Sequence, residues 1–225
     1  MLVKDWMTKD PVTITDETSM MKAIHLMKER RFRRLPVVHE GKLVGMVTDR
    51  DLKEASPSKA TTLDVHELYY LLAELQIKEI MTRNPLTLSP DDTVEHAAQL
   101  MLEKTISGLP VVDAEGLLVG IITQSDVFQA FIHITGISQG GVQYALRLED
   151  KPGVIKEVVD LLREKGARFV SLLTSYATAK VGFRDVYLRV KMSPEAARAA
   201  QTELAGRYDL LYMIPEEANG LALPV

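Results

Sequence analysis

The sequence predicts a mixed α/β fold, with two copies of a β-α-β-β-α unit followed by a smaller βαββαβ domain. Residues 3–55 recur as residues 77–130, and Met7-Thr8 returns as Met81-Thr82 at an offset of 74 positions. Within each copy, short apolar runs typical of strands alternate with apolar residues at helical spacing. After residue 142 the pattern changes to strands and helices in the ferredoxin-like order. These observations divide the chain into a tandem repeat and a C-terminal domain.

Three short motifs are shared by the two copies and define their alignment. Each copy opens with Met-Thr-x-x-Pro-x-Thr, continues with Leu-Pro-Val-Val and closes with Gly-x-x-Thr-x-x-Asp. The repeats are therefore expected at 1–55 and 77–134, which together form a module over 1–134. The three motifs lie at 7–13 and 81–87, at 35–38 and 109–112, and at 45–51 and 120–126.

Each copy is expected to contain the same elements in the same order. A short extended piece leads into a helix, whose predicted N-cap is Ser19 in the first copy and Thr93 in the second. Two strands joined by a tight turn follow, and a short helix begins at the closing motif. The predicted extended pieces and strands are 12–15, 35–38 and 43–48, then 86–89, 109–112 and 117–123; the predicted apolar helix faces are Met20, Ala23, Ile24 and Met27, then Val94, Ala97, Ala98, Met101 and Leu102.

The segment between the repeats is predicted to form a connecting helix at about 62–76. Val65, Leu68, Leu72 and Leu75 recur there at helical spacing. We expect this helix to cover part of the repeat core.

The C-terminal domain is predicted to span 142–216, after a flexible glycine-rich hinge at 135–141 and before a tail at 217–225. Gly166 is expected to end its first helix, and Ser193 to cap its second. The predicted strands are 142–148, 169–175, 183–191 and 210–214, and the predicted helices are 154–165 and 194–204.

The composition is that of a globular protein, with 46% hydrophobic and 26% charged residues in a chain of 225. The absence of cysteine excludes disulfides, thiolate metal sites and cysteine nucleophiles. A net charge of −4 argues against a general nucleic-acid binder. The sequence shows no apolar run of the length of a signal peptide or a membrane span, so we expect a cytoplasmic protein that does not bind a membrane.

The shared motifs resemble those of CBS domains, which occur in pairs called Bateman modules. The resemblance covers about 1–134 and implies a regulatory sensor that binds AMP, ADP, ATP or a related adenosyl ligand, with or without magnesium. It also implies that the chain forms a homodimer.

The closing motif points to ligand chemistry by itself. Thr48 with Asp51, and Thr123 with Asp126, place a hydroxyl and a carboxylate at a strand-to-helix junction. A carboxylate accepts two hydrogen bonds and so suits a ribose diol, whereas helix N-terminal amides and arginines suit phosphate. The alternative interpretation is that both aspartates only cap helices and both threonines only end strands.

In CBS pairs, one site combines the closing motif of one repeat with the opening and Leu-Pro-Val segments of the other. The resemblance therefore implies two sites, of which only the first has arginines beside its strand and should prefer more phosphorylated ligands. The basic run at 28–34 also fits a solvated helix end, and only its last two arginines are assigned to phosphate. The first site would hold Val12, Thr13, Arg33, Arg34, Pro36, Thr123 and Asp126, and the second Thr48, Asp51, Leu86, Thr87, Ser107, Gly108 and Pro110.

The βαββαβ order and an Asp-Lys-Pro-Gly turn resemble an ACT domain, a kind of domain that binds amino acids at dimer interfaces. The resemblance implies an amino-acid site at Asp150, Lys151, Pro152 and Gly153, and the alternative is a plain turn. A CBS pair followed by an ACT domain resembles the AcuB type of acetoin-utilisation proteins.

The sequence argues against an enzyme. Its five histidines lack metal-ligand spacing on a helix, and no Gly-x-Ser-x-Gly, P-loop or Gly-x-Gly-x-x-Gly motif is present. We therefore expect no catalytic residues, no metal and no cofactor. A structural, dimerisation and partner-docking role is the alternative to ligand sensing, and an enzyme of acetoin or acyl metabolism is a more distant one.

Overall fold

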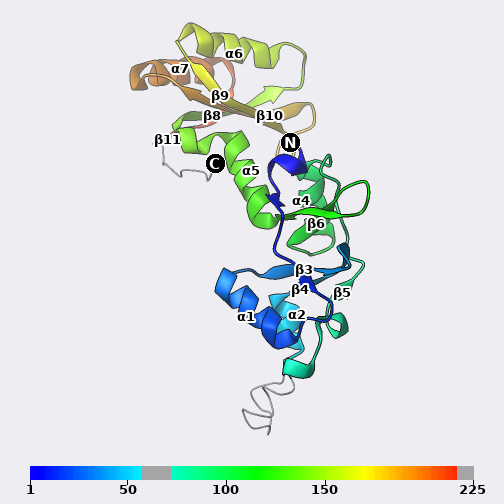
Figure 1. Cartoon of the computed structure of the whole chain (residues 1–225). Helices are drawn as coiled ribbons and strands as arrows, with labels where there is room; N and C mark the ends of the chain where they lie inside the picture. Colours follow the sequence, from blue (N-terminus) through cyan, green and yellow to red (C-terminus); the bar gives the residue numbers. More distant parts are fainter. Residues whose placement is uncertain (57–71, 217–225) are drawn as a thin grey trace. The chain divides into compact units, whose positions relative to one another are not determined.

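A computed structural model describes residues 1–56 and 72–216 (Figure 1). It contains two compact units, Met1–Phe128 and Gln129–Val225, and the division falls inside a helix, before the expected hinge. Residues 62–71 of the predicted connecting helix and the tail at 217–225 lie outside the described residues, whereas residues 72–74 are helical. Within the described ranges, no helix is both long enough and apolar enough to cross a membrane.

Both repeats form the predicted β-α-β-β-α unit, and both long helices begin at the predicted caps. Ser19 Oγ accepts a hydrogen bond from the Lys22 N–H, and Thr93 Oγ1 accepts one from the His96 N–H. In the second repeat, the extended piece forms a parallel bridge from Leu88 to the next strand. The first repeat contains β2 (Ile14–Thr15), α1 (Met20–Arg30), β3 (Arg34–His39), β4 (Lys42–Thr48) and α2 (Asp49–Glu54); the second contains α4 (Val94–Glu103), β6 (Gly108–Val112), β7 (Leu118–Thr123) and α5 (Gln124–Thr135).

Each repeat takes one edge strand from the opening motif of the other. β1 (Thr8–Lys9), which follows the short helix η1 (Val3–Asp5), pairs antiparallel with β7 of the second repeat. β5 (Thr82–Arg83), which follows η2 (Ile77–Glu79), pairs antiparallel with β4 of the first. The resulting sheets have the strand orders β1-β7-β6 and β2-β3-β4-β5, so neither sheet is complete without residues from both repeats.

Two glycines allow the exchanged strands to lie close. A Cβ atom at Gly45 would lie closer than 3.0 Å to the sulfur of Met81 and 3.1 Å from the carbonyl oxygen of Thr82. A Cβ atom at Gly120 would meet Met7 and Thr8 in the same way. The Met-Thr motif of one repeat and the glycine of the other repeat are therefore two halves of one packing contact.

The helix faces of the repeats form the core largely as predicted. Met20, Ala23 and Met27 of α1 are buried, as are the first residue of α4, Ala97 and Met101. The assignment of Leu102 to the core face is wrong, because its side chain is 79% exposed. Successive residues in a helix point about 100° apart, so Leu102 is turned away when Met101 faces the core.

The C-terminal unit has the predicted βαββαβ order. Its four strands form one antiparallel sheet in the order β11-β8-β10-β9, which is the ferredoxin-like arrangement. The core combines Tyr144, Leu146 and Leu188 of the sheet with Leu162 and Leu204 of the helices. Its elements are β8 (Gly141–Glu149), α6 (Val154–Glu164), β9 (Arg168–Ser175), β10 (Phe183–Lys191), α7 (Pro194–Arg207) and β11 (Asp209–Glu216).

The C-terminal sheet also carries a buried ion pair. Asp185 is 1% exposed. Its two oxygens accept hydrogen bonds from Nε and Nη2 of Arg147 at 2.8 and 3.1 Å, and Oδ2 accepts a third from Thr178 Oγ1 at 2.6 Å. These hydrogen bonds lower the pKa of Asp185 below its ordinary value. The buried carboxylate is therefore compensated by donors from two other segments.

The glycine-rich segment expected as a hinge has a defined conformation against this sheet. Gly136 and Gly140 have φ values of 67° and 66° and flank a short 3-10 helix, η3 (Ile137–Gln139). The carbonyl oxygen of Thr135 accepts hydrogen bonds from Ser171 Oγ at 2.8 Å and Arg189 Nε at 2.9 Å. The glycines here provide positive φ angles and close packing.

Candidate functional site

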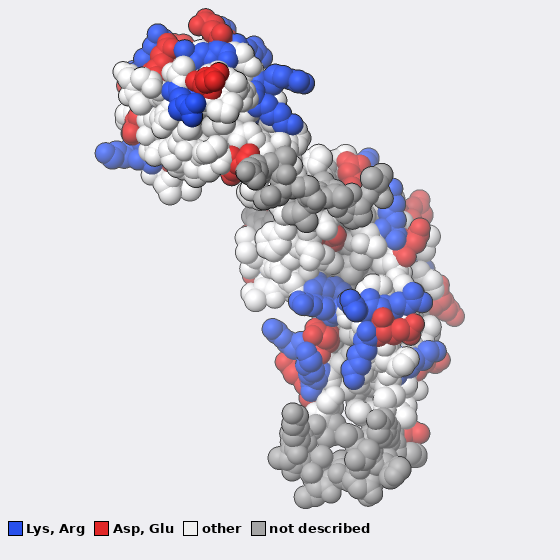
Figure 2. All heavy atoms as spheres, turned by 90° about the vertical axis from the view of Figure 1, so that its left-hand side faces the viewer, with Lys and Arg blue, Asp and Glu red and all other residues white. Residues whose placement is uncertain are grey.

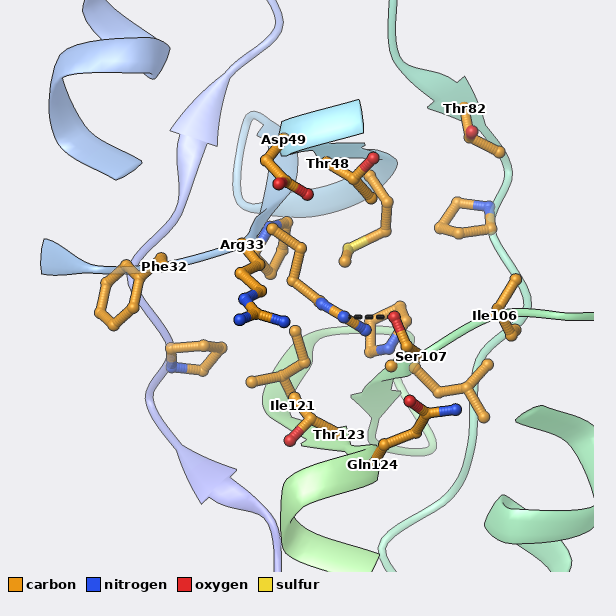
Figure 3. A pocket seen from close by; sticks show the side chains of 18 of the residues that line it. Phe32, Arg33, Thr48, Asp49, Thr82, Ile106, Ser107, Ile121, Thr123 and Gln124 are labelled. Atoms are coloured by element: carbon orange, nitrogen blue, oxygen red, sulfur yellow. Dashed lines mark hydrogen bonds between the residues drawn. The ribbon is translucent and has the colours of Figure 1, made fainter. Parts of the chain in front are cut away.

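The N-terminal unit contains a partly open cavity of about 1020 Å³ that is lined by both repeats (Figure 3). This volume is at the upper end of the range for small-molecule sites. Figure 3 shows Arg33 pointing into it, between Thr48 and Asp49 on one side and Ile121 and Thr123 on the other. The lining residues are Thr8, Pro11, Val12, Arg31, Phe32, Arg33, Arg34, Pro36, Met46, Thr48, Asp49, Arg50 and Asp51 from the first repeat, and Thr82, Asn84, Pro85, Leu86, Thr105, Ile106, Ser107, Gly108, Leu109, Pro110, Ile121, Thr123, Gln124 and Ser125 from the second.

The two Thr-x-x-Asp motifs have the same internal geometry. Asp51 Oδ2 accepts hydrogen bonds from the Thr48 N–H at 2.7 Å and the Thr48 hydroxyl at 2.8 Å. Asp126 Oδ2 accepts the equivalent pair from Thr123, both at 2.7 Å. Asp51 and Asp126 therefore do cap the helices that follow Thr48 and Thr123. The capping bonds use Oδ2, which leaves Oδ1 as the acceptor to offer a ligand.

Arg34 crosses from the first repeat to the second. Its Nη2 donates a hydrogen bond of 2.5 Å to Ser107 Oγ, drawn as a dashed line in Figure 3. A Cβ atom at Gly108 would lie closer than 3.0 Å to this guanidinium group, so the glycine leaves the space that Arg34 fills. The sequence placed Arg34 in one site and Ser107-Gly108 in the other, but the structure brings them into direct contact.

The charge on the cavity wall is unequal between the repeats. All the charged lining residues among the described part of the chain come from the first repeat, namely four arginines with Asp49 and Asp51. In the second repeat, the positions equivalent to these four arginines hold uncharged residues. Figure 2 shows charged side chains gathered over the first repeat on the face in view. Arg31, Arg33, Arg34 and Arg50 correspond to Thr105, Ser107, Gly108 and Ser125.

Backbone strain also occurs at the cavity. Arg31 and its repeat equivalent Thr105 have φ values of 57° and 55°, and Asn84 has a φ of 47°. All three line the cavity. Non-glycine residues with positive φ are uncommon and are found more often at functional sites than elsewhere.

Eleven of the fourteen residues predicted to bind nucleotide line the cavity. Thr13, Thr87 and Asp126 are not among the lining residues; Thr87 is exposed, and the other two are half-buried. The sequence reasoning missed Arg31 and Arg50. A comparison of the two repeats position by position could have found both, because each of these arginines is aligned with a small, uncharged hydroxyl residue in the other repeat.

The turn predicted to bind an amino acid lies at the start of α6, where all four of its residues are exposed. Asp150 Oδ1 is 3.3 Å from Arg184 Nε, and the Lys151 ammonium is 2.5 Å from a carboxylate oxygen of Glu149. Gly153 has a φ of 94° and is the N-cap of the helix. In the part of the chain that the structure describes, no group of three or more histidine, aspartate or glutamate side chains has the geometry of a metal site.

Comparison with known proteins finds similar chains for the repeat module. A CBS domain-containing protein of Dictyostelium discoideum is 35% identical over 134 residues, which are 59% of this chain and 92% of that protein. The L-aspartate semialdehyde sulfurtransferase of Methanocaldococcus jannaschii is 37% identical over 131 residues, 58% of this chain, but the match spans only 23% of the sulfurtransferase.

Among solved structures, a Vibrio cholerae protein assigned to acetoin utilization (AcuB) is 31% identical, with a TM-score of 0.51. The match covers 62% of this chain and 96% of that one. The family model described as CBS domain matches residues 3–58 and 77–133, which are half of this chain. The paired motifs, the exchanged edge strands and these matches agree, and the chain belongs to the family of CBS-domain proteins.

Proposed function

We propose that the protein is a non-catalytic regulatory sensor that binds an adenine nucleotide, AMP, ADP or ATP, in the cavity between its repeats. The observation that carries this proposal is the cavity itself, which is lined by the Thr-x-x-Asp segments of both repeats and by four arginines. Membership of the CBS-domain family supports the same function, since the repeat module is the part of the chain that forms the cavity.

The lining residues suit the parts of a nucleotide. Oδ1 of Asp51 accepts hydrogen bonds from the ribose hydroxyls. Asp126, which lies just behind the lining segment Thr123–Ser125, is proposed to do the same at the other motif. The arginines bind the phosphates, with magnesium where the ligand carries it. Apolar side chains such as Met46 and Ile121 pack on the faces of the adenine ring. The half containing Arg33 and Arg34 prefers the more phosphorylated ligand.

Replacing Asp51 or Asp126 with asparagine is expected to weaken nucleotide binding by about 1.5 to 3 kcal/mol, the contribution of a hydrogen bond to a charged group. An asparagine oxygen can still accept the capping bonds from Thr48 or Thr123, so the fold should persist. Isothermal titration calorimetry with AMP and ATP measures the effect. Asp91→Asn is the matched control, because Asp91 is exposed and belongs to neither Thr-x-x-Asp motif. Equal affinities for the wild type and both variants would remove these carboxylates from the site.

We also propose that the protein functions as a homodimer. Large apolar side chains are exposed on the helices of the repeat module, including Leu102, Phe128 at 63% and Phe131 at 62%. A second copy that covers these side chains would remove apolar surface from water. Light scattering at micromolar concentration should give about twice the chain mass of 25.1 kDa. A mass equal to that of one chain would rule out the dimer.

For the C-terminal unit, we propose that it is an ACT domain and binds an amino acid at Asp150–Gly153. The ferredoxin-like strand order supports this proposal. A thermal-shift screen of the twenty amino acids tests it, because a ligand that binds only the native state raises the melting temperature. If none of them does so, the domain is better explained as a dimerisation or partner-docking device. The similarity to AcuB makes acetoin utilisation a process that the sensor could regulate.

A further inference from the structure

We propose that the cavity binds only one phosphorylated ligand at a time, because both halves share a single anion position at Arg34. The second half then accepts only an adenosine-type ligand without a phosphate. This inference rests on the proposed function, and it adds a rule about which pairs of ligands bind together.

Arg34 lies against its own counterpart in the other repeat. Positions 34 and 108 are equivalent in the alignment, with arginine in one repeat and glycine in the other. The guanidinium group of Arg34 lies against Gly108 and donates its hydrogen bond to Ser107 Oγ. Arg34 therefore occupies the place where the two halves of the cavity meet. A Cβ atom at position 108 would require this guanidinium group to move, so the glycine is what allows Arg34 to reach the second repeat.

Charged groups of both repeats act on the Arg34 guanidinium group. Burial lowers the pKa of Arg34, Asp49 of the first repeat and Asp126 of the second raise it, and Arg33 lowers it. Carboxylates from both repeats thus act on the same guanidinium group. The pKa of arginine is so far above neutrality that this group stays cationic.

Two phosphorylated ligands would bring two negatively charged groups into one cavity. The described lining of the second repeat has no charged side chain, so the cationic side chains near a phosphate in that half are the arginines of the first repeat. Among the described residues, Arg34 is the lining arginine with a hydrogen bond to the second repeat, so two phosphorylated ligands would bring their phosphates to this guanidinium group. Like charges at short distance in a partly buried site repel strongly. One phosphorylated ligand and one uncharged nucleoside avoid this repulsion.

Calorimetry on the full chain with AMP and adenosine tests the rule. We expect one AMP per chain and, with AMP saturating, one further adenosine. Arg34→Gln should lower AMP affinity at least about 10-fold, the loss of a charge-assisted hydrogen bond, and should lower adenosine affinity much less. Arg30→Gln is the matched control, because Arg30 is exposed and is not a lining residue.

The outcomes separate the two proposals. Two AMP molecules bound per chain, or an equal loss of AMP and adenosine binding in Arg34→Gln, would overturn the single anion position and leave nucleotide sensing intact. If neither AMP nor adenosine binds to the wild type, the proposed function fails and this inference fails with it. The stoichiometry of the wild type needs no variant, so a poorly folded variant does not prevent the test.

Discussion

Asp185→Ala is expected to lower the free energy of unfolding of the C-terminal unit by about 3 kcal/mol. Removing one partner of a buried ion pair costs about 3 to 5 kcal/mol because the other charge is left uncompensated. Arg147 is 21% exposed and can regain some water, so we expect the lower end of that range. Urea unfolding followed by circular dichroism, with hydrogen exchange of the β8 and β10 amides, measures the loss.

Asp209→Ala is the matched control for this variant. Asp209 of β11 lies opposite the same Arg147 of β8 in the strand register, but the Asp209 side chain is exposed. We expect a change of less than about 0.5 kcal/mol. A second check is the double variant Arg147→Met with Asp185→Leu, which should recover most of the loss because no buried charge remains. A loss as large for Asp209→Ala as for Asp185→Ala would contradict the buried-pair explanation.

The same ion pair predicts a pH dependence. The pKa of Asp185 is lowered in the folded protein, chiefly by its hydrogen bond from Arg147 and then by that from Thr178. A carboxyl whose folded pKa is depressed contributes stability above its unfolded pKa of about 3.9, and this contribution is lost as the pH falls through the folded pKa. The stability difference between the wild type and Asp185→Asn should therefore be full near neutrality and narrow in acid below about pH 4.

Gly45→Ala and Gly120→Ala are each expected to destabilise the repeat module by about 2 kcal/mol. The new methyl group would overlap the sulfur of Met81 or Met7 and press on the carbonyl oxygen of the following threonine. Overpacking of this kind costs about 1 to 3 kcal/mol. Thermal unfolding followed by the fluorescence of Trp6, which precedes the contact at Met7, measures the loss.

Two comparisons make this prediction specific. Gly206→Ala, in α7, places a methyl group where no atom lies within 4 Å, and should stabilise the protein by about 0.5 to 1 kcal/mol. Adding Met81→Ala to Gly45→Ala relieves the overlap with sulfur but not the contact with Thr82, so the two losses should be less than additive. Full additivity would mean that Gly45 and Met81 act independently.

Local signals account for most of the secondary structure that was predicted. β10 begins and ends at the predicted residues, and Ser193 accepts the capping hydrogen bond from the Ala196 N–H. These features depend on residues a few positions apart, which periodicity and capping rules describe well. The exchange of opening strands between the repeats joins β1 to β7 over more than a hundred residues. No local pattern specifies such a pairing, although the repeated Met-Thr and Gly motifs mark its two sides.

The candidate site likewise combines residues that a local motif predicts with contacts that depend on the folded arrangement. Repetition of the Thr-x-x-Asp motif was enough to find Thr48, Asp51 and Thr123, which all line the cavity. It could not show that Arg34 reaches across to Ser107, because that contact depends on how the two repeats face each other. The resemblance assigned them to separate sites, and only the folded arrangement reveals that they meet.

The exchanged edge strands also set an order of events during synthesis. The chain emerges from the ribosome N-terminus first, and the sheet of the first repeat lacks its fourth strand until Thr82–Arg83 has been made. β1 is made before its partner strand and has nothing to pair with until β7 follows, more than a hundred residues later. The N-terminal unit is therefore expected to fold as one piece only after its second repeat has been made, with its first repeat incomplete on the ribosome until the second has begun.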